Sequence, residues 1–111
     1  MILETKEVNK LLVATITVKE ANLENAGQLK QEMFAIIDKG HRYIALDFEY
    51  VTYIDSSFLG AMVSSLKHAL GKGTDIYLIG VKKDILDLLR LIRMDKVFKI
   101  YPTVNEVALS I

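Results

Sequence analysis

Three consecutive polar residues, Asp55, Ser56 and Ser57, are the first candidates for chemistry in this chain. They follow an alternating apolar run and precede a helical pattern. A strand-to-helix turn presents its polar side chains at the edge of a sheet, within reach of a ligand or partner. All three residue types cap helices well, and a serine can also accept a phosphoryl group, which adds about −1.5 to −2 charge. The residues alone favour capping and leave a phosphorylation switch as the alternative.

Catalytic and metal chemistry find little support in the other residues. His41 and His68 are the only histidines, neither stands in a metal-binding spacing, and both are predicted to be surface residues. The Gly-x-Ser-x-Gly pattern that exposes a nucleophilic serine is absent. The run 71–73 (Gly-Lys-Gly) follows a helical pattern and indicates a helix end rather than a phosphate loop. We therefore expect no enzyme activity, no metal and no cofactor.

One further carboxylate, Asp47, stands at the end of a predicted strand and is the acid most expected to face a site. The competing interpretation is a strand terminus whose carboxylate accepts local hydrogen bonds, and the sequence favours it slightly.

The composition bounds the kind of protein. The 111 residues are 51% hydrophobic, with 14 basic and 14 acidic side chains and no cysteine. This length suits one domain covering residues 1–111. A net charge of zero argues against electrostatic binding to nucleic acid or to an anionic membrane, and it leaves a homodimer open. Residues 1–7 do not resemble a signal peptide, and no stretch approaches the roughly 20 apolar residues of a membrane helix, so we expect a cytoplasmic protein without membrane insertion.

Strand-like and helix-like patterns alternate along the chain. Strands are predicted at 2–5, 11–18, 43–48, 75–80 and 97–100, and helices at 25–39, 57–71, 82–93 and from 104 onward. The order β-β-α-β-α-β-α-(β)-α predicts an α/β fold with a mixed, mostly parallel sheet and about four helices.

Local signals refine these elements. Asn9 suits a turn between the first two strands, because asparagine tolerates positive φ. Asn25 is expected to cap the first helix, Gly40 to end it, and Thr103 to cap the last helix. The second helix is expected to bury Leu59, Met62, Val63, Leu66 and Leu70.

The stretch 45–61 (Ala-Leu-Asp-Phe-Glu-Tyr-Val-Thr-Tyr-Ile-Asp-Ser-Ser-Phe-Leu-Gly-Ala) resembles the signature of STAS domains, and more narrowly that of bacterial anti-sigma factor antagonists. Their usual pattern is a strand ending in Asp, a short loop, and Asp-Ser-Ser/Thr-Gly-Leu-Gly opening a helix. The runs 88–101 and 103–108 resemble the family's third helix, final strand and last helix. The resemblance covers nearly the whole chain and implies a single STAS-like domain.

The resemblance also implies a function. In that family the serine after the motif's Asp, here Ser56, is phosphorylated by an anti-sigma factor that is also a serine kinase. The unphosphorylated antagonist binds that partner and frees a sigma factor, and a PP2C-type phosphatase restores binding. The implied partner-binding residues are Asn22, Asp55, Ser56, Ser57, Phe58 and Leu59. Asp47 and Gly60 are implied motif residues, with Gly60 expected to allow close helix packing and Ser57 expected to cap the helix.

Two positions depart from the family pattern. Phe58 replaces the glycine after the hydroxyls, and it can be an apolar anchor in the interface or a core residue; the sequence supports both equally. Asn22 stands where the family often has an acid, in a loop expected to border the phosphorylated turn. The alternative function is an unphosphorylated scaffold or accessory subunit of a regulatory or lipid-transport complex. A nucleotide-binding or weakly hydrolytic domain ranks last.

Overall fold

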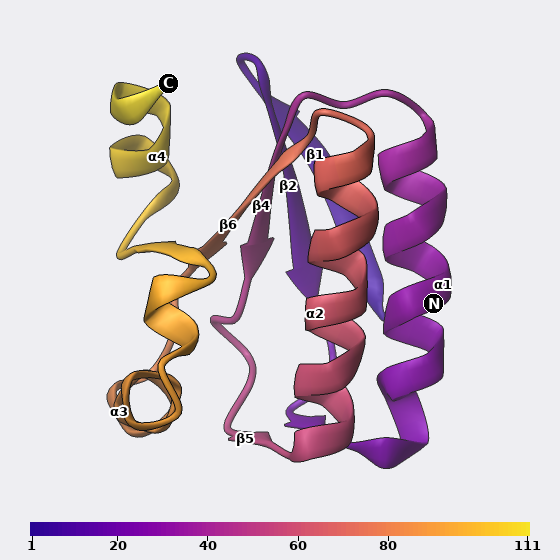
Figure 1. Cartoon of the computed structure of the whole chain (residues 1–111). Helices are drawn as coiled ribbons and strands as arrows, with labels where there is room; N and C mark the ends of the chain where they lie inside the picture. Colours follow the sequence, from indigo (N-terminus) through magenta and orange to yellow (C-terminus); the bar gives the residue numbers. More distant parts are fainter.

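The computed structural model describes residues 1–111 and contains one mixed five-stranded sheet with strand order β1-β2-β4-β6-β7 (Figure 1). Only β1 and β2 are antiparallel, and the other neighbouring strands are parallel. The predicted α/β class and mostly parallel sheet are therefore confirmed. The sheet strands are β1 (Leu3–Val8), β2 (Leu11–Ile16), β4 (Tyr43–Asp47), β6 (Asp75–Ile79) and β7 (Lys99–Tyr101), and the helices are α1 (Leu23–Asp38), α2 (Ser56–Gly71), α3 (Lys83–Leu91) and α4 (Val104–Ser110).

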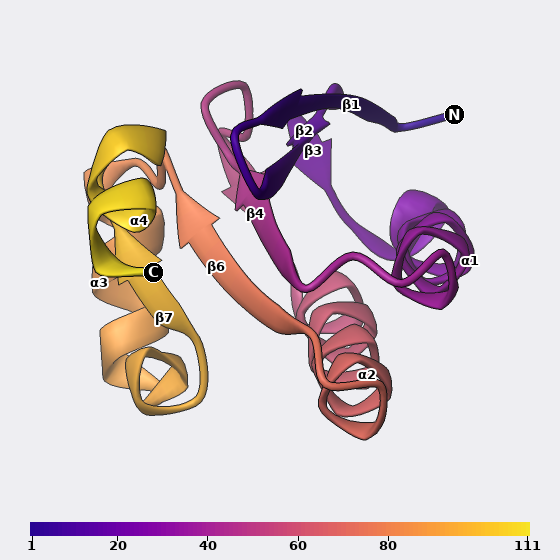
Figure 2. The same cartoon turned by 90° about the horizontal axis from the view of Figure 1, so that it is seen from above.

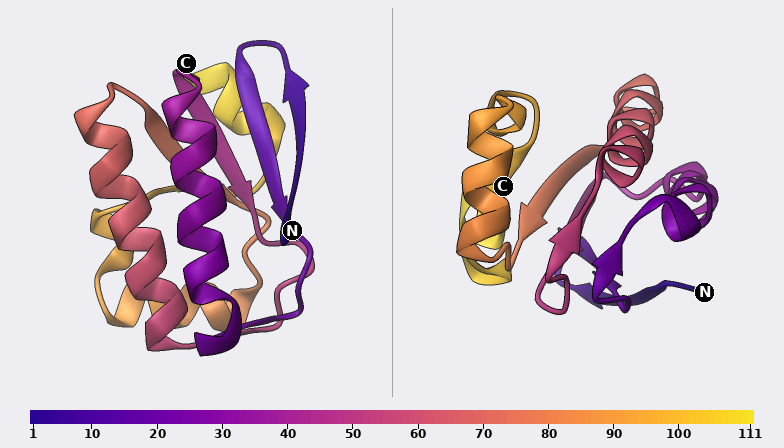
Figure 3. Two further views of the ribbon diagram at one scale, coloured as in Figure 1. Left: turned by 90° about the vertical axis from the view of Figure 1, so that its right-hand side faces the viewer. Right: turned by 90° about the horizontal axis from the view of Figure 1, so that it is seen from below.

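The sheet has an apolar core on each face. Ile44 and Leu46 of β4 join the larger cluster, which also holds the buried apolar residues of α1, α2 and α3. Ala45, between them, faces the smaller cluster beneath Val107 of α4. This alternation explains why β4 is continuously apolar, since both of its faces are covered. Figures 2 and 3 show α1 and α2 side by side on one face of the sheet.

Several predicted boundaries are confirmed. Asn9 has φ 56° in the turn between β1 and β2, and Gly40 has φ 93° just after α1. The Thr103 hydroxyl accepts a hydrogen bond from the Glu106 backbone N–H at 3.3 Å and so caps α4. No helix is long and apolar enough to cross a membrane.

The cap of α1 was predicted at the wrong residue. Asn22, not Asn25, is the N-cap, and its side-chain oxygen accepts from the Glu24 N–H at 3.0 Å. Asn25 lies three residues later and accepts from the Asn22 N–H at 2.9 Å. The two asparagines thus form a reciprocal capping box, with Asn25 in the place that Glu or Gln usually takes.

The buried face of α2 also differs from the prediction. It consists of Phe58, Ala61, Met62, Ser65, Leu66 and Ala69. Leu70, predicted to be buried, is 63% exposed. Ser65 is buried, and its hydroxyl is satisfied because it donates to the Ala61 carbonyl oxygen at 2.9 Å. The prediction followed the largest apolar side chains of α2, whereas the face that packs on the core also contains the small residues Ala61, Ser65 and Ala69.

Short elements escaped the sequence patterns. The strands β3 (Glu20–Ala21) and β5 (Tyr53–Ile54) form a separate parallel pair, and the 3₁₀ turn η1 (Met94–Lys96) separates α3 from β7. Two-residue strands are too short for a detectable period.

Candidate functional site

The turn that begins α2 is joined to the loop that begins α1. The Ala21 carbonyl oxygen accepts from the Asp55 N–H at 3.0 Å, and the Lys19 carbonyl oxygen accepts from the Thr52 N–H at 2.8 Å. These bonds accompany the β3–β5 pairing, which brings both helix N-termini to the same end of the molecule (Figure 1). The expected neighbourhood of the 19–22 loop and the serine turn is therefore present.

Asp55 holds the two helix N-termini together. Its Oδ1 accepts from the Phe58 N–H at 2.9 Å, which caps α2, and its Oδ2 accepts from the Leu23 N–H at 2.9 Å in the first turn of α1. A carboxylate is favoured at this position because helix N-termini carry partial positive charge and unpaired N–H groups. Asp55 therefore caps α2 and connects it to the first turn of α1. The prediction that Ser57 caps α2 is wrong.

Ser56 and Ser57 are consequently free of the capping role. Ser56 is the first residue of α2 and its side chain is exposed, whereas Ser57 is half-buried. Of the two hydroxyls, the Ser56 hydroxyl is therefore the more accessible to an enzyme or a partner.

Two exposed apolar side chains beside this turn were not among the predicted partner-binding residues. Leu23 is 72% exposed and Tyr53 is 54% exposed. The Leu23 N–H donates to Asp55, and Tyr53, two residues before Asp55, lies on β5, which pairs with β3. Leu23, Tyr53 and Ser56 are called the turn surface below. Leu23 stands three residues before the buried Ala26, so helical spacing alone could not have shown that it is exposed.

Other predicted partner-binding residues take different places. Phe58 is 0% exposed and belongs to the main core, so its prediction as a partner-binding side chain is wrong and the core alternative is correct. It lies three and four residues before Ala61 and Met62 on the buried stripe of α2. Leu59 is half-buried at the edge of that core, and Asn22 is half-buried and occupied by capping.

Gly60 does not permit a close helix contact, contrary to expectation. It is exposed, and a Cβ placed there would meet no atom within 4 Å. The glycine that does permit a close approach is Gly80, where φ is 65° and an added Cβ would lie 2.7 Å from Asp47 Oδ1.

Asp47 is a hydrogen-bonded strand terminus. Its Oδ1 accepts from the Glu49 N–H at 3.0 Å, and its Oδ2 accepts from the Thr15 hydroxyl at 3.5 Å. The Lys82 ammonium donates to the Glu49 carbonyl oxygen, which fixes the same loop from the start of α3. Asp47 therefore shapes the segment leading to β5. The interpretation of Asp47 as a strand terminus whose carboxylate accepts local hydrogen bonds is confirmed.

His68 cannot serve Ser56 as a base. It lies twelve residues further along the same helix, which corresponds to about 18 Å at 1.5 Å per residue. Its Nε2 lies 2.6 Å from Asp38 Oδ1, and its ring stacks on Phe34 with centroids 4.0 Å apart. The hydrogen bond from His68 is the main cause that lowers the pKa of Asp38 below 3.8, with a smaller contribution from Lys72. No three His, Asp or Glu side chains gather as a metal site would require.

Comparison with known proteins agrees with this fold. The family model described as the STAS domain matches residues 4–107. A Thermotoga maritima protein, provisionally named an anti-sigma factor antagonist, is 35% identical over 89 residues, which cover 79% of each chain. The crystal structure of a Thermotoga maritima protein with the same provisional name has a TM-score of 0.88, with 30% identity over 97% of this chain and 92% of that chain.

A more distant likeness shows the fold alone. The Bacillus cell fate determinant SpoIIAA in its phosphorylated form has a TM-score of 0.71 at 14% identity, covering 97% of this chain and 96% of that chain. From the domain match and the Thermotoga relatives, the chain belongs to the STAS domain family and to its group of anti-sigma factor antagonists.

Proposed function

We propose that this chain is a cytoplasmic anti-sigma factor antagonist that binds an anti-sigma factor through the turn surface and is switched off by phosphorylation of Ser56. The observation that carries the proposal is the exposed Ser56 at the start of α2, which Asp55 has relieved of capping. The exposed Leu23 and Tyr53 beside it offer apolar contact area, and aromatic side chains are common anchors in interfaces.

Phosphorylation at this point would oppose binding by charge. A phosphoserine adds about −1.5 to −2 charge, which the N-terminus of α2 tolerates in the free protein. Burying that dianion under a partner is costly unless the partner supplies matching cations. Asp55 already places a carboxylate next to the same position. The nucleotide and metal for the transfer belong to the partner kinase.

The position of Phe58 supports this proposal. A phenyl ring projecting from the turn would crowd a kinase active site, but the ring lies in the core. The approach to Ser56 is therefore free of it, despite the departure from the family's glycine.

The relatives add support of a general kind. The Thermotoga relative carries the provisional name of an anti-sigma factor antagonist, and SpoIIAA, which shares the fold, is known in unphosphorylated and phosphorylated forms. On the same proposal a PP2C-type phosphatase removes the phosphate and restores binding.

The test begins with affinity capture of the tagged chain from its native cells and identification of the recovered partner. The purified partner with labelled ATP is expected to transfer one phosphate to the wild type and to Ser57→Ala, but none to Ser56→Ala. Ser56→Asp should weaken partner binding at least tenfold. Ser110→Asp, which adds the same charge at the exposed end of α4, should leave binding unchanged.

Equal labelling of Ser56→Ala and wild type would show that Ser56 is not the acceptor. A stable partner that neither labels the chain nor responds to Ser56→Asp would support an unphosphorylated scaffold or accessory subunit instead.

A further inference from the structure

We propose that the groove between α3 and β7 binds an extended acidic peptide segment of a partner protein, at a surface separate from the turn surface. The groove encloses about 610 Å³ and shares no residue with the turn surface. Its lining contains all eight consecutive residues 95–102, together with Val81, Leu86 and Arg90. A groove lined by one continuous segment of backbone suits an extended peptide as its ligand.

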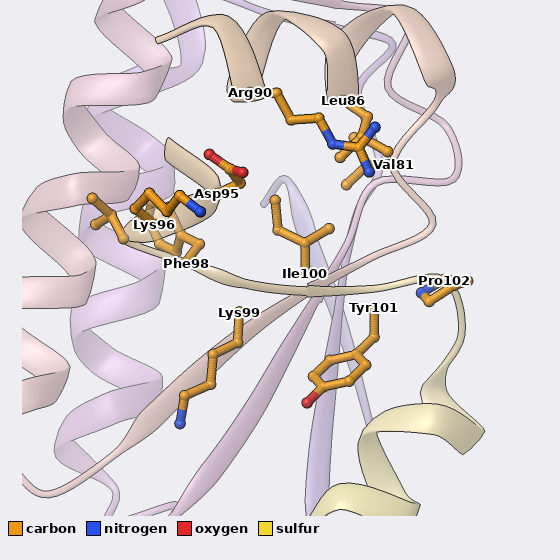
Figure 4. Close-up of a pocket in the computed structure, with 11 residues that line it drawn as sticks. Val81, Leu86, Arg90, Asp95, Lys96, Phe98, Lys99, Ile100, Tyr101 and Pro102 are labelled. Carbon is orange, nitrogen blue, oxygen red and sulfur yellow. The ribbon is translucent and has the colours of Figure 1, made fainter. Parts of the chain in front are cut away.

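The floor and roof of the groove come from different elements. Figure 4 shows Leu86 and Arg90 reaching from α3 toward the strand, and Ile100 pointing from β7 into the space between them. Lys99 and Tyr101 point to the opposite side of β7 in the same view. A strand laid beside β7 would therefore meet apolar side chains and Arg90 on one side and Lys99 on the other.

The strand at the groove lacks a neighbour on one side. β7 pairs with β6 only, so no strand pairs with its outer edge. Such an edge carries unpaired backbone groups that can accept an added strand, and addition of an extended peptide to a sheet edge is a common recognition mode.

Charge determines which partner fits. Two cations, Arg90 and Lys96, line the groove against the single carboxylate of Asp95. Lys99 extends from the other face of β7, where its ammonium lies 5.5 Å from the centroid of the Tyr77 ring. None of these three cations takes part in the ion pairs of this chain, which involve Asp38 and Asp87. In a chain with a net charge of zero, this is a local positive excess that favours an acidic partner.

The same cations disfavour a second copy of this chain. Pairing two β7 edges would place a lysine, Lys99, on each of the paired strands, and repulsion between lysines on edge strands is a common device against self-association. An acidic strand would turn that repulsion into attraction.

The test uses a fluorescein-labelled eight-residue peptide of alternating glutamate and valine with blocked ends, and a lysine–valine peptide as its control. Fluorescence anisotropy is expected to show saturable binding of the acidic peptide and at least tenfold weaker binding of the basic one. The double variant Arg90→Glu/Lys99→Glu should weaken binding at least tenfold. The variant Lys30→Glu/Lys67→Glu makes the same change of charge on exposed sites of α1 and α2, and it should weaken binding less than threefold.

A second peptide separates strand addition from simple charge attraction. N-methylation of alternate backbone nitrogens removes the amide donors along one edge, and it should weaken binding at least tenfold. Equal binding of acidic and basic peptides, equal effects of the two double variants, or indifference to N-methylation would each overturn the proposal. A dimer in sedimentation that Arg90→Glu/Lys99→Glu converts to a monomer would overturn it in favour of self-association.

Discussion

The buried ring of Phe58 gives the sharpest test of how this site is built. Replacing a fully buried phenylalanine by alanine costs about 3–5 kcal/mol of unfolding free energy, through lost transfer energy and a residual cavity. The phenyl ring is 0% exposed and packs in the main cluster, so the cost applies in full apart from roughly 0.5 kcal/mol that alanine returns through its higher helix propensity. A domain of 111 residues is expected to have a stability of about 6–17 kcal/mol. Phe58→Ala should therefore fold but lose a large share of its stability.

The measurement is urea unfolding followed by circular dichroism, with partner binding measured on the folded variant. Phe58→Ala should lower the unfolding free energy by about 3–4 kcal/mol and leave partner affinity nearly unchanged. Tyr53→Ala and Leu23→Ala remove exposed side chains, so they should change stability by less than about 1 kcal/mol but weaken partner binding. If Phe58→Ala kept its stability and lost its partner, the ring would be an interface anchor and the structural assignment would be wrong.

Two further predictions concern glycine and pH. Gly60→Ala should stabilise the chain by about 0.5–1 kcal/mol, because an exposed helical site gains propensity and the added Cβ meets nothing. Gly80→Ala should instead destabilise it by more than about 1–2 kcal/mol, since the residue has φ 65° and its Cβ would lie 2.7 Å from Asp47 Oδ1; thermal melts of both variants check the opposite signs. The pKa of Asp38 is lowered in the folded state, so its contribution is complete above its ordinary pKa of 3.8 and disappears as pH falls through the lowered value. The stability difference between wild type and His68→Leu should therefore shrink as the pH falls from about 4 through the lowered pKa of Asp38, and a difference that grew instead would contradict this linkage.

Much of the fold was readable from local pattern. The β-rich runs, the helical stripes and the turn residues Asn9 and Gly40 each depend on neighbours within a few positions, and they predicted the order and the mostly parallel sheet. The motif around Ser56 was equally visible, because an acid and two hydroxyls at a strand–helix junction stand out from apolar surroundings.

The errors lie where a residue's role depends on distant parts of the chain. Ser57 was expected to cap α2, but the choice among Asp55, Ser56 and Ser57 depends on a second helix. Only Asp55 has two carboxylate oxygens, one of which accepts from the Phe58 N–H and the other from the Leu23 N–H. The two-residue strands β3 and β5 have no pattern of their own, and they exist because the chain segments before both helices pass side by side.

The sequence by itself determined the α/β class, the element order and the serine turn, because these follow from side-chain periodicity and local backbone preference. Only the tertiary structure decided that Phe58 is a core residue while Leu23 and Tyr53 are exposed. All three are apolar, so their composition cannot separate them. For Phe58 and Leu23, burial depends on which faces of α2 and α1 reach the core, and for Tyr53 it depends on the pairing of β5 with β3. Both are set by contacts between residues far apart in the chain.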